Sequence, residues 1–400
     1  MSLNIITLIK EQAHYFKDDV IADRRHLHAN PELSFEEFNT SAYVQKRLKK
    51  IGIGFKIIAN TGVLAEIKGQ KGDGPLIALR ADMDALPIKE ENEVNYKSGN
   101  DGVMHACGHD AHTSVLLGVA SILNAIKDEF SGTVRFIFQP AEEKLPGGAL
   151  QVIAGGALDN PSPTYVIGQH VFPQIESGKI AIPRGTCMAS MDEIVVTVKG
   201  RGGHAAMPHI TVDPVQIASQ LVVSLQQLVS RMANPQMPTV LSFGKFIGDG
   251  AINVIPDSVY MEGTFRTFND EWRLEAHEKM KKLAKSLVEG MGGTCEFNIH
   301  CGYPALNNHA ELCEAMNMIA KEFLGEENIV TIENLMAAED FAYYSRQRPS
   351  VFYFLGVGNA ENNITAPLHS PRFNIDENAL ETGTGLMAYF AFQLLRREQH

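Results

Sequence analysis

The sequence predicts an α/β protein with a mostly parallel sheet, helices on both faces of that sheet, and a smaller α+β domain inserted into the chain. Between residues 76 and 167, short apolar runs alternate with helical stretches, which is the order typical of a parallel sheet. Residues 190–302 instead follow a strand, helix, strand, strand, helix, strand order, the split ferredoxin-like arrangement. The length of 400 residues also favours two domains over one core.

The amino-terminal part is predicted to contain a helix that starts near residue 34. Ser34-Phe35-Glu36-Glu37 has the form of a capping box, which satisfies the first free N–H groups of a helix, and Gly52 is placed to end that helix. The elements predicted after it are a strand at 76–79, a helix at about 111–130, a strand at 134–138, a helix around Ala149 and a strand at 165–167.

The inserted domain and the return to the first domain are predicted from the same periodicities. The elements expected in the insert are a strand at 194–198, a helix at 214–232, strands at 240–246 and 259–265, a helix at 271–289 and a strand at 294–300. A helix at 310–324, a buried strand at 351–355 and an amphipathic helix after Asp376 then resume the first domain. The predicted division is 1–185, 186–302 and 303–400.

Composition narrows the class of function. The formal net charge of -12 argues against broad binding to nucleic acid or to an anionic membrane, because both need a basic surface. Five scattered cysteines do not resemble a disulfide framework, and the first residues lack the pattern of a secretory signal. We therefore expect a cytoplasmic protein that acts on small molecules.

A dense group of potential metal ligands lies between residues 104 and 112. Three histidines and Cys107 fall within these nine positions, directly ahead of a predicted helix. Imidazole and thiolate are strong ligands for divalent transition metals, so this spacing favours a metal site. The alternative is a polar loop whose histidines only cap the helix.

Three further segments place acidic or imidazole groups directly after predicted strands. They contain Asp82 and Asp84, Glu142 and Glu143, and His170. Sites in open α/β sheets form beyond the carboxyl ends of the strands, so these loops are expected to converge. Of two adjacent glutamates, one can bind a metal while the other handles the proton of an attacking water. A solvated acidic pair is the alternative interpretation.

At these positions the chain resembles the dinuclear metallo-aminoacylase and carboxypeptidase family. The resemblance is to its amidohydrolase branch, which contains N-acyl-amino-acid amidohydrolases, hippurate hydrolases and auxin-conjugate hydrolases, and it spans nearly the whole chain. The segments that carry it are RADMDALPI (80–88), MHACGHDAHT (104–113), FQPAEE (138–143), GRGGHAAMPH (200–209), NVIPD (253–257), GTFR (263–266), MAAEDF (336–341) and LHSPRF (368–373).

This resemblance implies a zinc-exopeptidase-like catalytic domain that holds two divalent metal ions per subunit. The implied metal ligands are Cys107, His109, Glu143, His170 and His369. Glu142 is implied to be the general base and acid, while Asp82 and Asp84 support the ligands by fixing the orientation of their rings. A thiolate among imidazoles suits zinc, nickel or cobalt and carboxylates also admit manganese, so the identity of the metal stays open.

The resemblance also implies that the inserted domain is a lid and a dimerisation domain. His204 matches the family's oxyanion-stabilising histidine, which often reaches the active site of the neighbouring subunit. Asn253 and Arg266 match positions that hold the carboxylate of the substrate, for which a guanidinium gives paired hydrogen bonds. A surface-turn histidine and a lid salt bridge are the alternatives for His204 and Arg266. A homodimer through the inserted domain is expected.

The predicted function is metal-dependent hydrolysis of the amide bond of N-acyl amino acids, which releases a carboxylic acid and a free amino acid. A metallo-dipeptidase or aminopeptidase is an alternative, because a dipeptide has the same amide and free carboxylate. A non-catalytic metal-binding protein of the same fold is a second alternative, and the retention of both Glu142 and Glu143 argues against it. A serine hydrolase is not expected, because the sequence lacks a G-x-S-x-G elbow.

Overall fold

The computed structural model describes residues 5–398, and the chain divides into two compact units. The first unit contains the residues up to Gly185, Asn307–Glu333, and the residues from Tyr343 onward. The second unit contains Thr186–Leu306 together with Asn334–Ala342. The short segment Asn334–Ala342 therefore belongs with the insert, although more than 25 residues separate it in sequence from Leu306.

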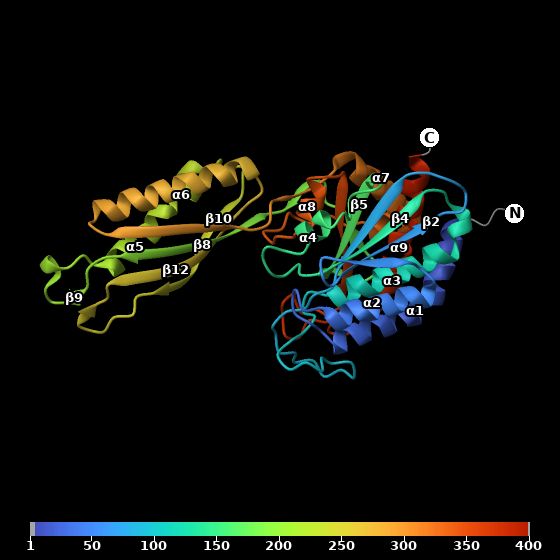
Figure 1. The fold of residues 1–400 in the computed structure, drawn as a ribbon, viewed down its shortest axis with the longest axis horizontal. Coiled ribbons are helices and arrows are strands. Elements are labelled where there is room, and N and C mark those ends of the chain that lie inside the picture. Colours follow the sequence, from blue (N-terminus) through green and yellow to red (C-terminus); the bar gives the residue numbers. More distant parts are fainter. Residues whose placement is uncertain (1–4, 399–400) are drawn as a thin grey trace. The chain divides into compact units, whose positions relative to one another are not determined.

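A seven-stranded sheet forms the centre of the first unit (Figure 1). Its strands, in spatial order, are β1 (Phe55–Ile58), β2 (Gly62–Lys68), β4 (Thr133–Gln139), β3 (Leu76–Asp82), β5 (Tyr165–Glu176), β15 (Ser350–Gly358) and β6 (Ile180–Ala181). The four strands from β4 to β15 run parallel, and the strands at both edges pair antiparallel with their neighbours. This arrangement confirms the predicted α/β class and the mostly parallel sheet.

Helices pack against this sheet and against each other. The helices outside the insert are α1 (Ile5–Ala29), α2 (Phe38–Ile51), α3 (His109–Ala125), α4 (Ala149–Ala154), α7 (Ala310–Leu324), α8 (Ala342–Ser345) and α9 (Asn378–Arg397). Nearly every residue of α3 is buried, because its sequence is apolar or small on all sides and the helix contacts β3, α1 and α9. The core therefore continues up to the helix end at which the predicted metal ligands begin.

The predicted capping box at residues 34–37 is wrong. Helix α2 begins at Phe38, and its N-cap residue Glu37 makes no side-chain capping bond to the helix. The Ser34 hydroxyl instead donates to Asp84, and the Glu37 carboxylate reaches the segment before Glu142. Long-range partners thus replace the local ones. The predicted end of the helix at Gly52 is confirmed, because Gly52 is the C-cap residue and has the left-handed conformation at φ 84°.

The second unit has the predicted ferredoxin-like order. Its main elements are β8 (Ser190–Lys199), α5 (Pro214–Leu225), β10 (Thr239–Ile247), β12 (Ser258–Thr267), α6 (Asp270–Gly290) and β13 (Thr294–Cys301). The antiparallel sheet has the order β10-β12-β8-β13, and α5 and α6 pack on it and on each other (Figure 1). β9 (Gly203–His204) and β11 (Val254–Ile255) form a separate antiparallel pair. In the chain, β9 comes shortly after β8, and β11 lies between β10 and β12.

Some element bounds differ from the predicted ones. The helix expected to reach residue 130 ends at Ala125, and one tight turn over Lys127–Glu129 follows it. The helix expected over 214–232 is α5 followed by a π-helical turn at Leu228–Met232. Strands β7 (Gly185–Met188) and β14 (Leu306–Asn308) lie where the chain passes between the units. Within residues 5–398, no helix is both long enough and apolar enough to span a bilayer.

Candidate metal centre and active site

The ends of three parallel strands bring the predicted site residues of the first unit together. The register pairs Asp82 of β3 with Gln139 of β4, and Arg80 of β3 with Gly168 of β5. Asp84 lies two residues after the end of β3, Glu142 lies three residues after the end of β4, and His170 lies two residues beyond Gly168 in β5. His170 lies inside β5 and not after it, because the strand continues to Glu176. The expected convergence of these segments is observed.

Helix α3 contributes the remaining inner residues of this group. Its N-cap is Gly108, which has φ 82°, and a Cβ atom at this position would lie 2.4 Å from Cγ2 of Val171. Only glycine tolerates both the left-handed conformation and this close approach to β5. The turn sets Cys107 and His109 on either side of Gly108, beside the strand that carries His170.

The five predicted metal ligands form one continuous cluster. Cys107 Sγ lies 3.4 Å from His170 Nε2, and Glu143 Oε1 lies 3.3 Å from His369 Nε2 and 3.9 Å from His109 Nε2. Two groups of three share Cys107, and in each the possible ligand atoms lie within 4.8 Å of one another: Cys107 with His109 and His170, and Cys107 with Glu143 and His369. Cys107 is thus the residue common to two adjacent candidate centres.

Hydrogen bonds to neighbouring groups leave one nitrogen of each inner histidine facing the cluster. His109 Nδ1 lies 3.2 Å from Asp84 Oδ1, and His170 Nδ1 donates to the carbonyl of Val171 at 2.7 Å. Both rings therefore direct Nε2 toward the other members of the cluster. His112 differs, because its Nδ1 is bonded to Asp82 at 2.6 Å and its Nε2 accepts the Val171 N–H. Both of its nitrogens are occupied, so it orients neighbouring groups.

Two buried atoms of the cluster lack the partners that buried polar atoms normally have. Among residues 5–398, His109 Nε2 and Glu143 Oε1 are buried and make no hydrogen bond, and their only contacts of opposite charge are with each other and, for Glu143, with His369. A buried polar group without a partner is costly, and such atoms are uncommon in native proteins. These two atoms without hydrogen bonds, together with the thiol and imidazole groups beside them, fit divalent metal ions of the kind that sulfur, nitrogen and oxygen bind jointly.

The charges around the cluster also favour a bound cation. Burial and the carboxylates of Glu143, Glu142 and Asp82 raise the pKa of the Cys107 thiol well above its ordinary value. Burial lowers the pKa of His109, but the carboxylates of Asp82, Asp84 and Glu143 outweigh burial and raise that pKa to about 10. The cluster thus has an excess of negative charge, which a bound cation would neutralise while favouring the thiolate.

The loop that carries Glu142 and Glu143 is held by its backbone. The N–H groups of Glu142 and Glu143 donate to the two oxygens of Asp84, each at 3.0 Å. Asp84 is fully buried and also bonds His109, so one carboxylate aligns both the ligand histidine and the two glutamates. Asp82 is paired with Arg80 at 2.6 Å and with His112. Asp84 thus contacts His109, and Asp82 contacts His112.

A further buried network at the start of α3 was not predicted from the sequence. Arg24 Nε donates to Asp110 Oδ2 at 2.9 Å, and His28 Nδ1 lies 2.7 Å from the same oxygen. Burial alone would raise the pKa of Asp110, but Arg24 and His28 outweigh it and hold that pKa well below its usual range. Both partners come from α1, far from α3 in sequence, so no local pattern indicates them.

Comparison with known protein families shows which family the chain belongs to. A model of the peptidase family M20/M25/M40 matches residues 78–393. The chain belongs to this family. An N-acyl-L-amino acid amidohydrolase of Geobacillus stearothermophilus is 44% identical over 304 residues, which cover 76% of this chain and 81% of that protein. An N-acetyl-L-cysteine deacetylase of Bacillus subtilis is 39% identical over 402 residues, with 98% and 92% covered.

Solved structures agree with this assignment. A dinuclear metal-binding peptidase of the M20 family from Bacillus subtilis has a TM-score of 0.82 at 36% identity, and the match covers 96% of this chain and 99% of that one. The present M20-family chain is therefore a metal-dependent hydrolase of amide bonds.

The predicted lid residues of this M20-family chain lie at two different places in its second unit. His204 of β9 pairs in register with Val254 of β11, and the Ala205 N–H donates to the Asn253 carbonyl at 2.9 Å. His204 and Asn253 are therefore neighbours, and both are exposed. Arg266 lies near the other end of β12, where it donates to Thr264 and to the Met336 carbonyl.

The separation within the second unit can be estimated from β12. This strand starts at Ser258, beside the segment that carries Asn253, and Arg266 is its ninth residue. At a rise of about 3.3 Å per residue, Arg266 lies roughly 25 Å along the strand from that end. A shared role in holding one substrate carboxylate requires the two side chains to be close together. Within one chain, the structure instead separates Asn253 from Arg266 by most of the length of β12.

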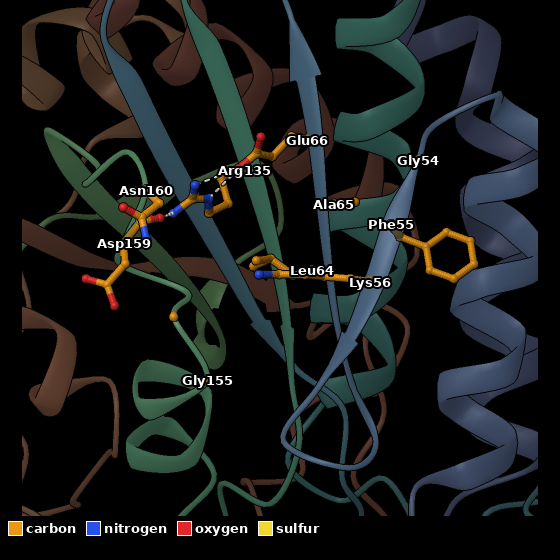
Figure 2. Close-up of a pocket in the computed structure, with 11 residues that line it drawn as sticks. Gly54, Phe55, Lys56, Leu64, Ala65, Glu66, Arg135, Gly155, Asp159 and Asn160 are labelled. Carbon is orange, nitrogen blue, oxygen red and sulfur yellow. Dashed lines mark hydrogen bonds and ion pairs between the residues drawn. The ribbon is translucent and has the colours of Figure 1, made fainter.

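A separate hollow of about 510 Å³ lies in the first unit, beside β1, β2 and β4 (Figure 2). None of the five clustered ligand residues lines it. Figure 2 shows the Arg135 guanidinium directed toward Glu66 and Asp159. Its Nε donates to the Glu66 carboxylate at 2.7 Å, and Nη1 donates to the carbonyls of Ala157 and Asp159. This cation is engaged within the protein, and the hollow is distinct from the candidate centre.

Proposed function

We propose that this chain hydrolyses the amide bond of N-acyl amino acids, releasing a carboxylic acid and a free amino acid. The observation that carries the proposal is the cluster of Cys107, His109, Glu143, His170 and His369 in the first unit, in which His109 Nε2 and Glu143 Oε1 are buried without a hydrogen bond. The names of two relatives, an N-acyl-L-amino acid amidohydrolase and an N-acetyl-L-cysteine deacetylase, support the substrate class.

The five clustered residues would hold two divalent metal ions, with Cys107 common to both. Bound there, the ions would supply positive charge that polarises the amide carbonyl and lowers the pKa of water. The Nδ1 atoms of His109 and His170 are engaged elsewhere, so their Nε2 atoms are the ones available to a metal. His369, whose side chain is 53% exposed, stands at the open side of the cluster, where a substrate would enter.

Glu142 is proposed to move the proton in both halves of the reaction. It is buried, and it belongs to a group with His109 and Glu143 whose oxygen and nitrogen atoms lie within 4.8 Å of one another. Its carboxylate takes a proton from the attacking water and delivers it to the departing amide nitrogen. The hydroxyl of the water thus adds to the acyl carbon, the carbon–nitrogen bond breaks, and the other proton of the water ends on the departing nitrogen.

His204 and Asn253 are proposed to act on the cluster of a second copy of the chain. Strand β8 has ten residues, so these two residues lie roughly 30 Å from the end of the second unit at which the chain enters it. Their surroundings support an interface, since Met207, Ile210, Ile252 and Val254 are all exposed apolar side chains. His204 would stabilise the oxyanion, and Asn253 would meet Arg266 of the other copy at the substrate carboxylate.

A homodimer through the second unit follows from this proposal. Strand β10 is an edge strand of the four-stranded sheet, and Phe246 and Ile247 on it are 43% and 46% exposed. Exposed apolar edge strands can pair with another chain.

We further propose a reducing, cytoplasmic location. All five cysteines are free thiols, which supports this proposal.

The proposal is tested by a substrate panel. The protein is loaded separately with zinc, manganese, nickel or cobalt and is offered N-acetyl and N-benzoyl amino acids beside dipeptides of matching sequence. We expect release of free amino acid from the N-acyl compounds at a higher kcat/KM than from the dipeptides. Faster cleavage of the dipeptides would instead assign a dipeptidase, and no hydrolysis of either class with any metal would contradict the proposal.

A further inference from the structure

Two buried carboxylates receive three consecutive backbone N–H groups of the loop that carries the proposed catalytic glutamate. Glu37 Oε1 accepts the Ala141 N–H at 2.9 Å, and Asp84 accepts those of Glu142 and Glu143. Both carboxylates are fully buried. Backbone N–H groups usually donate to backbone carbonyls. Hydrogen bonds to ionised carboxylates are stronger, so a loop whose three successive N–H groups donate to side-chain carboxylates is held closely in place.

The first of these three residues has a strained backbone. Ala141 has φ 54°, in the left-handed region that costs a residue with a side chain about 1–2 kcal/mol. Its N–H is bonded to Glu37, and its carbonyl accepts the Gly148 N–H at 2.8 Å. A conformation of this kind persists only where the surroundings determine it. The turn at Ala141 sets the direction in which the next residue, Glu142, leaves the sheet.

Glu37 is not occupied by its own helix. The N–H groups of Asn39 and Thr40 at the start of α2 donate to Glu32, so Glu37 is not needed as a cap. Its Oε1 also accepts the Phe35 N–H at 2.8 Å, and its Oε2 accepts the Thr61 hydroxyl at 2.7 Å. The carboxylate therefore links the turn before α2 and the β1–β2 connection to the loop after β4.

We propose that Glu37 is a positioning residue that fixes the backbone of Ala141 and thereby the orientation of the Glu142 carboxylate. This inference rests on the proposed role of Glu142 as the proton carrier. Glu37 acts by reach and by accepting hydrogen bonds, and its own charge is not required. Glu37 does not contact the five proposed metal ligands in any described interaction, and Asp84 holds the N–H of Glu143, so we expect metal content to change little when Glu37 is replaced.

The surroundings of Glu37 agree with a geometric role. Burial and the neighbouring Asp84 carboxylate raise the pKa of Glu37 to about 7, so a substantial part of it carries a proton near neutrality. A proton on Oε2 can be donated to the Thr61 hydroxyl, which can accept as well as donate. Oε1 then still accepts both N–H groups. The amide of glutamine has the same reach and the same arrangement of donor and acceptor.

Side-chain length and charge can be changed separately at position 37. Glu37→Gln keeps the length and removes the charge, Glu37→Asp keeps the charge and removes one methylene, and Glu37→Asn removes both. We expect kcat for the best N-acyl amino acid to stay within about threefold of wild type in Glu37→Gln. In Glu37→Asp and Glu37→Asn we expect kcat to fall about 10- to 100-fold, because displacements near 1 Å have effects of this size.

Matched controls separate positioning from general damage. Thr61→Val removes only the contact to Oε2, so its kcat is expected to stay within about threefold of wild type. Metal content and KM of all Glu37 variants should stay near the wild-type values, since Glu37 contacts neither metal ligands nor substrate. The short variants come as a pair, so the comparison with Glu37→Gln remains possible if either one does not fold.

The outcomes are distinct from those of the proposed function. If Glu142→Gln is as active as wild type, the proposed function itself fails. If Glu142→Gln is inactive but the short Glu37 variants keep the wild-type kcat, or lose activity only through metal loss or a raised KM, the positioning role is wrong. A lower kcat in Glu37→Gln than in Glu37→Asp would also overturn it, because charge would then matter more than reach.

Discussion

The clustered residues of the first unit are mostly buried, and His109 and Glu143 among them are bonded to the carboxylate of Asp84. His204 and Asn253 of the second unit are instead exposed, the first on the two-residue strand β9 and the second directly before β11. His109, for example, is oriented by Asp84, but the only described hydrogen bond of the His204 ring is from the Ala206 N–H two residues away. The first group has the contacts that preorganise a site. The second has the exposure that a binding partner would remove.

The largest expected effect concerns the two adjacent glutamates of the first unit. Glu142→Gln should lower kcat by about 100- to 10,000-fold with near-normal metal content, because positioned acid–base catalysis contributes on this scale. Glu143→Ala should instead lose bound metal, and added metal should partly restore its activity. Metal stoichiometry and steady-state kinetics measure both. A metal-free Glu142→Gln beside a fully loaded Glu143→Ala would reverse the two assignments.

Cys107 sharpens the comparison within the cluster. As a ligand shared by two ions it should, when changed to Ser, lower metal affinity by at least about tenfold, the scale on which even supporting residues act. In the wild-type protein, bound metal should slow alkylation of this thiol relative to the chelator-treated protein. Mass spectrometry of the alkylated peptide measures this. Equal alkylation rates with and without metal would remove Cys107 from the ligand set.

The dependence of the second unit on a partner can be broken directly. Glu142→Gln and His204→Ala should each be inactive alone, but subunit exchange between them should restore activity in mixed dimers. With random exchange, about a quarter of all sites would combine an intact Glu142 with an intact His204 of the other copy. A tagged subunit and size-exclusion chromatography establish that exchange has occurred. Exchange without recovered activity would mean that His204 does not act across the interface.

The smallest effect is a dependence of stability on pH in the metal-free protein. The folded-state pKa of Glu37 is raised to about 7 from an ordinary value of 4.5. The native state therefore holds this proton more tightly, and the resulting stability is present below pH 4.5 and lost as the pH rises through 7. Relative to Glu37→Gln, the wild-type free energy of unfolding should fall by about 1–3 kcal/mol between pH 5 and 8. Urea titrations measure it, and a flat or rising difference would contradict the shift.

The strand-end rule predicted the convergence of the aspartates after β3 and the glutamates after β4, whereas His369 was indicated only by the family resemblance. Asp82, Asp84, Glu142 and Glu143 follow apolar runs in the sequence, and parallel pairing brings the ends of those runs to one edge of the sheet. Nothing local indicates Glu37, because its partner Ala141 is 104 residues away. The Ser34 and Glu37 pattern instead favoured a capping box, and tertiary hydrogen bonds replaced it.

The lid residues show a different limit of sequence-based prediction. The family motif assigns Asn253 and Arg266 the same ligand, but motif order contains no distance. Only the register of β12 shows that a whole strand separates them within one chain. A role shared between two copies is a property of an assembly, so one sequence can suggest it through resemblance but cannot derive it from spacing.

The order of the proposed ligands along the chain has a consequence for biosynthesis. Cys107, His109, Glu143 and His170 all precede the second unit, which begins at Thr186, while His369 follows it. A ribosome therefore makes the whole second unit before it makes the last ligand. On the proposed ligand set, a nascent or truncated polypeptide holds an incomplete centre, so full metal loading becomes a late event that distinguishes finished chains from unfinished ones.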